Sequence, residues 1–108
     1  MNAGRLNKRV WIQEPVWSAA SASGEKTVSR WDNVAEVWAS IEPLSGREYW
    51  AAAQAQSSVT HKVTIRYREG VDQTMRVLFG DRELYIESII DPREAHRFLE
   101  LACVEQTT

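Results

Sequence analysis

The sequence predicts a mainly β protein, a small antiparallel β-barrel of about six strands with one short inserted helix and one long loop in its N-terminal half. Short segments rich in β-branched and aromatic residues recur along the chain and are separated by turn residues. A length of 108 residues fits a single domain, 1–108. Closing the strands into a barrel would also remove the unpaired edges that make open sheets prone to aggregation.

The first half of the chain contains two predicted strands and the long loop. Residues 8–14, "KRVWIQE", form the first strand, which we expect to end at Pro15. Residues 15–33 have little hydrophobic periodicity and a Ser/Ala/Gly centre, which predicts a long loop. In residues 34–42, "VAEVWASIE", apolar and polar positions alternate, as expected for a second strand.

The second half contains four more predicted strands. Alternation is clearest in 59–68, "VTHKVTIRYR", which predicts one packed and one solvated face. Segments 75–79 and 83–90 form a hairpin across a Gly/Asp-containing turn, and 97–105 is the last strand. The inward-facing positions predict a core of Val10, Ile12, Val37, Ile41, Val63, Ile65, Val77, Leu84, Ile86, Leu99 and Leu101.

The inserted helix is predicted at about residues 45–56, within "PLSGREYWAAAQAQ". Ser45 and Glu48 have the spacing of a capping box, and good helix formers follow them. Arg47 lies in the first turn, where its charge is poorly matched to the helix dipole, so we expect a partner carboxylate or a DNA phosphate beside it. Two interpretations stay open: a short crossover helix that covers one end of its own barrel, with Tyr49 and Trp50 as its anchor, or a helix built to pack closely against another subunit.

No catalytic, cofactor-binding or metal-binding pattern is recognisable. His61 is expected to be a neutral, hydrogen-bonded residue of the core or rim, and His96 a surface residue in a polar turn. Cys103 alternates with leucines, which favours a small buried hydrophobe over a nucleophile. We therefore expect a protein that is not an enzyme and that needs no cofactor.

Charge and hydropathy restrict the partners further. The formal net charge of −2 does not indicate a general nucleic-acid binder. The polar face of the third strand could still contact DNA or another partner through Lys62, Arg66 and Arg68, although a polar strand face is usually just solvated. With no signal-peptide pattern and no bilayer-spanning stretch, we expect a soluble protein made in the cytoplasm, with no membrane partner.

Taken in order, these segments resemble the head-tail joining family of long-tailed bacteriophages, the head-closure or stopper proteins. The resemblance covers nearly the whole chain. It rests on "GRLNKRVWIQ", "GEKTVSRWDNVAEVWASIEPLSGREYWAA", "THKVTIRYREG", "RVLFGDRELYIESIID" and "FLELACVE".

The resemblance implies a structural virion protein, assembled in the bacterial host, that forms a homo-oligomeric ring beneath the portal. Its implied partners are further copies of itself, the portal or adaptor ring, a tail terminator or tail completion protein, and packaged DNA. It also suggests that the insertions at 15–33 and 43–58 serve assembly or channel lining, with Trp17, Trp31, Arg47, Glu48, Tyr49 and Trp50 at subunit or partner contacts. The alternative is a monomeric barrel that binds nucleic acid or a peptide.

Overall fold

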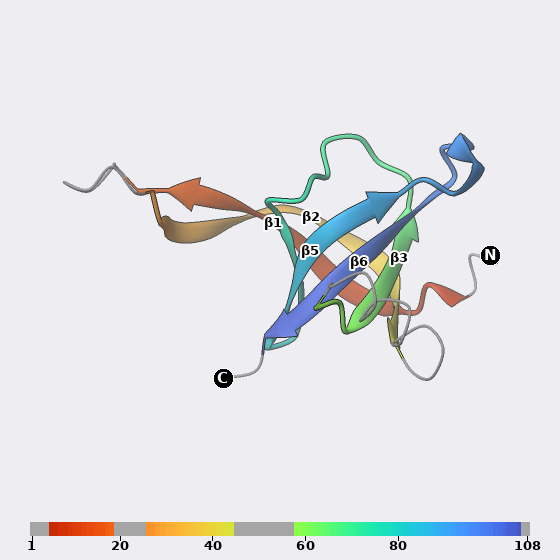
Figure 1. The fold of residues 1–108 in the computed structure, drawn as a ribbon, viewed down its shortest axis with the longest axis horizontal. Coiled ribbons are helices and arrows are strands. Elements are labelled where there is room, and N and C mark those ends of the chain that lie inside the picture. The colour runs from red at the N-terminus through yellow and green to blue at the C-terminus, as the bar shows by residue number, and fades with distance from the viewer. Residues whose placement is uncertain (1–4, 19–25, 45–57, 107–108) are drawn as a thin grey trace.

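The computed structural model describes residues 5–18, 26–44 and 58–106, and these form a closed barrel of six antiparallel strands (Figure 1). The order around the barrel is β1-β2-β3-β6-β5-β4, and β4 pairs back to β1 to close it. The strands are β1 (Lys8–Trp17), β2 (Val28–Pro43), β3 (His61–Arg66), β4 (Arg76–Phe79), β5 (Arg82–Ile90) and β6 (Phe98–Gln106). A 3-10 turn, η2 (Pro92–Glu94), joins β5 to β6. The predicted fold class is confirmed.

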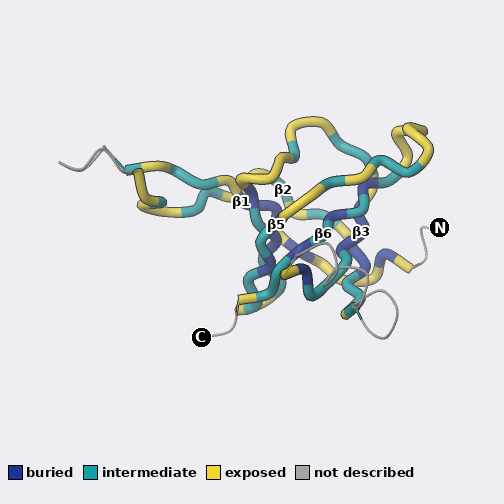
Figure 2. The backbone as a smooth tube through the Cα atoms, viewed as in Figure 1, coloured by how far each residue is buried: buried dark blue, intermediate teal, exposed yellow. Residues whose placement is uncertain are grey.

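The barrel interior is filled by the alternating apolar residues that the sequence predicts. Nine of the eleven predicted core residues are buried, and the other two, Val37 and Ile41, are partly buried and pack against them. Cys103 also lies in this core, fully buried, as expected. Figure 2 shows the buried segments gathered within the barrel.

The tight connection between β4 and β5 is the predicted hairpin turn. Gly80 has φ +62°, which suits the first central position of a two-residue hairpin loop. Phe79 and Arg82 pair on either side of the turn. The turn therefore fixes which residues of the two strands lie opposite each other.

The predicted long loop at 15–33 is wrong at both ends. Residues 15–17 continue β1 and residues 28–33 belong to β2, so the two strands extend well beyond the predicted segments 8–14 and 34–42. The predicted helix at about 45–56 lies outside the described residues.

Candidate interaction surface

Beyond the barrel, β1 and β2 continue as a two-stranded arm, here defined as residues 14–17 and 28–32. The arm projects from one side of the barrel (Figure 1). Its strands pair with each other from Glu14↔Asp32 to Trp17↔Val28, and none of its residues is buried. The Ser29 hydroxyl adds a 2.9 Å hydrogen bond to the Val16 carbonyl. The arm thus has regular backbone structure without a core of its own.

A cluster of polar and aromatic side chains around Arg76 holds the base of the arm against β4 and β5. We call this cluster the clip, and it consists of Gln13, Trp31, Asn33, Arg76, Glu83 and Tyr85. Arg76 Nε donates to Gln13 Oε1 (2.7 Å), and its Nη1 donates to Glu83 Oε1 (2.9 Å) and to the Tyr85 hydroxyl (3.1 Å). The guanidinium lies over the ring of Trp31, 4.3 Å from its centroid. A register shift between Ile12 and Gln13 falls at this point, as bulges often do where a strand changes direction.

The clip extends to both sides of Arg76. The Tyr85 hydroxyl donates to Glu83 Oε1 (2.7 Å), and the Gln13 amide donates to Asn33 Oδ1 (2.8 Å). Burial together with the hydrogen bond to Glu83 raises the pKa of Tyr85, so the phenol keeps its proton. Trp31 also meets Tyr85 edge to face, with ring centroids 5.8 Å apart. The clip therefore combines side chains from β1, β2, β4 and β5.

The two tryptophans expected at a partner contact have different environments. Trp31 packs into the clip on its own barrel, whereas the exposed fraction of Trp17, at the end of β1, is 51%. Exposed tryptophans are frequent anchors of protein–protein contacts. Trp17 is therefore the better placed of the two to meet a partner. The other expected contact residues, Arg47, Glu48, Tyr49 and Trp50, lie outside the described residues.

The three basic residues expected on one face of β3 have different surroundings. Lys62 faces Glu42, with 3.8 Å between the ammonium nitrogen and a carboxylate oxygen, so its charge is partly neutralised. Arg66 is exposed at the end of β3 and Arg68 follows it, half-buried, in the next loop. The two arginines share a hollow beside Trp38.

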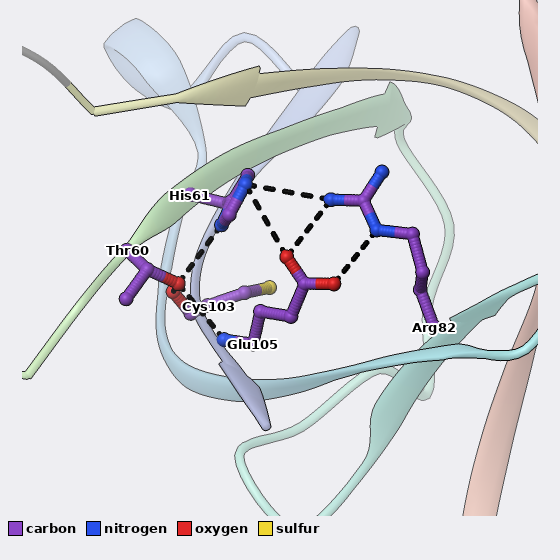
Figure 3. A network of polar contacts seen from close by, with 5 residues as sticks. All are labelled: Thr60, His61, Arg82, Cys103 and Glu105. Carbon is purple, nitrogen blue, oxygen red and sulfur yellow. Dashed lines mark hydrogen bonds and ion pairs between the residues drawn. The ribbon is translucent and has the colours of Figure 1, made fainter. Parts of the chain in front are cut away.

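A second polar cluster lies at one end of the barrel, next to buried Cys103 (Figure 3). Arg82 donates two hydrogen bonds to the Glu105 carboxylate, at 2.7 and 2.9 Å, and this interaction holds the pKa of Glu105 below its ordinary value. His61 Nε2 lies 3.6 Å from Glu105, and its Nδ1 is 2.8 Å from the Thr60 hydroxyl.

Burial sets the protonation of two groups at this end, His61 and Cys103. It lowers the pKa of His61 despite the attraction of Glu105, and the charge of Arg82 lowers it further. His61 is thus a neutral, hydrogen-bonded rim residue, as the sequence predicts. Burial also raises the pKa of the Cys103 thiol to about 12, which removes its nucleophilic form at neutral pH. Among the described residues, no group of three or more His, Cys, Asp or Glu side chains is arranged to hold a metal ion.

These features define a small closed β-barrel with a projecting arm and, among the described residues, no cluster arranged to hold a metal ion. The chain belongs to the family of phage head completion proteins, whose family model matches residues 1–106. It is therefore a structural, virion-associated protein of head completion rather than an enzyme, and it acts together with other virion components. The family resemblance predicted from the sequence is confirmed. In the described part of the chain, no helix is long and apolar enough to cross a membrane.

Two solved structures are similar over almost the whole chain. The solution structure of protein SF1141 from Shigella flexneri 2a has a TM-score of 0.67 and 26% identity, over 99% of this chain and 98% of that one. A chain from the virion of a native gene transfer agent particle has a TM-score of 0.66 and 19% identity, over 96% and 98%. No curated protein sequence matches.

Proposed function

We propose that the protein forms a homo-oligomeric ring at the portal vertex, where it closes the DNA-filled head and provides the surface on which the tail docks. The whole chain, 1–108, acts as one head-tail joining domain. Its partners are neighbouring copies, the portal or adaptor ring, a tail terminator or tail completion protein, and the packaged DNA in the channel.

The observation that carries this proposal is the projecting arm with Trp17 at the end of β1. A two-stranded ribbon is only marginally stable in water by itself. The clip provides the missing support, because Arg76 ties the base of the arm to the barrel through hydrogen bonds and the stack on Trp31. A supported projection with an exposed aromatic residue suits a contact with another subunit.

Ring formation adds a geometrical requirement. A closed ring is built from heterologous contacts, in which one surface of each subunit meets a different surface of the next. The arm projects from one side of the barrel, and the end of β3, where Arg66 lies, is on the opposite side (Figure 1). The two surfaces can therefore be occupied by different neighbours at the same time.

The experiment compares Trp17→Ala with a matched control, Trp11→Ala, in particles assembled without the wild-type protein. Trp11 is also partly exposed, at 36%, but it lies on the barrel wall opposite Leu78. We expect both isolated variants to unfold near the wild-type temperature. Particles with Trp17→Ala should lose DNA or fail to bind tails, and particles with Trp11→Ala should complete normally.

Two outcomes would overturn the proposal. Normal DNA retention and tail attachment with Trp17→Ala would remove the assembly role of the arm. A protein that stays monomeric on portal-containing heads, yet binds free DNA or a peptide, would instead support the monomeric binding module.

A further inference from the structure

Two adjoining hollows lie beside Trp38, and they share the side chains of Trp38 and Arg66. The first has a volume of about 440 Å³ and the second about 260 Å³. Because they share two walls, we treat them as one surface, the Trp38 groove. It is lined by Leu6, Asn7, Val37, Trp38, Arg66, Tyr67 and Arg68.

The groove offers an apolar contact that the barrel itself leaves open. The exposed fraction of Trp38 is 51%, although Val37 beside it packs against the core. Arg9 lies over the Trp38 ring at 4.9 Å from its centroid and is itself paired with Glu36. An exposed indole in a concave surface can bury an apolar side chain of a partner.

The groove also carries positive charge that has no counterion among residues 5–18, 26–44 and 58–106. Neither Arg66 nor Arg68 forms an ion pair in the part of the chain that the structure describes. The Arg68 Nε atom is buried and has no hydrogen-bond partner there. Arg66 is exposed and Arg68 is half-buried, so a partner carboxylate can meet the guanidinium groups from the solvent side and form charge-assisted hydrogen bonds with them.

We propose that the Trp38 groove binds an acidic peptide segment of a neighbouring virion protein. An apolar side chain of the segment packs on Trp38, and a carboxylate pairs with Arg66 and Arg68. This inference rests on the proposed role in assembly and specifies the chemistry of one partner.

A peptide suits the groove better than a DNA backbone does. Phosphates need positive charge but gain nothing from the apolar walls formed by Leu6, Val37 and Trp38. Two further cations near this surface are already paired, Arg9 over the Trp38 ring with Glu36 and Lys62 on β3 with Glu42. An acidic peptide with an apolar residue matches both properties of the groove.

The test uses the isolated full chain, labelled with nitrogen-15, and follows backbone amide, indole and arginine Nε–H signals by NMR during titration. The probe is the capped pentapeptide DLDFD. Its controls are the uncharged NLNFN, the apolar-free DGDGD, and a short oligothymidylate. We expect DLDFD to shift the Trp38 indole and the Arg66 and Arg68 signals, and to bind more tightly than any control.

Substitutions locate the site. Arg66→Gln and Arg68→Gln should each weaken DLDFD binding about tenfold, the loss expected for one charge-assisted hydrogen bond. Arg30→Gln, an exposed arginine of the arm, is the matched control and should leave the affinity unchanged. Arg66 is exposed, so its variant remains informative even if Arg68→Gln alters folding.

Equal binding of DLDFD and NLNFN would overturn the proposal, as would the absence of any shift at the groove. Preferential binding of oligothymidylate there would assign the groove to nucleic acid instead. These outcomes are independent of ring formation, because the titration needs no ring. Failure of the proposed assembly role would appear in particles, and failure of the groove would appear in the isolated chain.

Discussion

Arg76→Met tests whether the clip stabilises the arm. Only 13% of the Arg76 side chain is exposed, and its guanidinium joins Gln13, Glu83 and the ring of Trp31. Methionine keeps the apolar stem and removes the charged head, so the change isolates the polar contacts. The arm should lose its support while the barrel core stays intact.

The expected cost follows from these contacts. Losing the bond from Arg76 leaves the Oε1 atom of buried Gln13 without its donor, which costs about 1–3 kcal/mol. The cation–π contact with Trp31 adds about 0.5–1 kcal/mol. The side chain of Glu83 is 37% exposed and can be hydrated instead, so losing its ion pair with Arg76 contributes little. The free energy of unfolding should fall by about 1.5–4 kcal/mol.

Urea unfolding measures this loss, and amide hydrogen exchange locates it. Amides of the arm, residues 14–17 and 28–32, should exchange faster in Arg76→Met, while those of β3 and β6 change in line with global stability. Arg30→Met is the control, because Arg30 is 67% exposed and its ion pair, with Asp32, is on the surface. Equal stabilities and equal exchange in the two variants would refute the role of the clip.

Three other predictions concern the barrel. Ile65→Ala should cost about 2–5 kcal/mol in urea unfolding, because Ile65 is fully buried, whereas Ile90→Ala, at a site 55% exposed, should cost far less; equal costs would show that the strand phase is wrong. Folding lowers the pKa values of Glu105 and His61, so the unfolded chain binds protons more readily at both residues. The stability that each residue contributes above its ordinary pKa is therefore lost as the pH falls. The loss begins below about pH 4.5 for Glu105 and below about pH 6.5 for His61. Glu105→Gln should therefore flatten the pH dependence of the unfolding temperature in the lower range, and His61→Gln should flatten it in the higher range. Unchanged profiles would contradict the lowered pKa values of these two residues. Cys103 should react with iodoacetamide only after unfolding, because burial suppresses its thiolate, and rapid labelling of the native protein would contradict its position.

The strands of the barrel are predictable from the sequence because burial on one face leaves a two-residue period. Leu99 and Leu101 illustrate this, since both point inward and both are buried. The arm lacks that signal. Its residues are exposed or half-buried on both faces, so no alternation marks it as strand, and Pro15 suggests an end where the strand continues.

The contacts of the clip also could not be predicted from the sequence, but for a different reason. Arg76 and Gln13 are 63 positions apart, and their contact depends on the pairing of β4 with β1 that closes the barrel. Isolated polar residues on predicted strands give no indication of such a contact. In contrast, the exposed position of Arg66 at the end of β3 follows from the alternation along that strand, whereas Arg68 lies beyond the strand, in the next loop.

The central claim, a ring at the portal vertex held partly by the arm, is tested most directly by a cryo-EM reconstruction of the vertex in assembled particles. We expect a ring of barrels of this fold beneath the portal, with Trp17 of each copy buried against a neighbouring subunit or against the adjoining ring. A vertex without density for this barrel, or a ring in which every arm extends freely into solvent, would contradict the account.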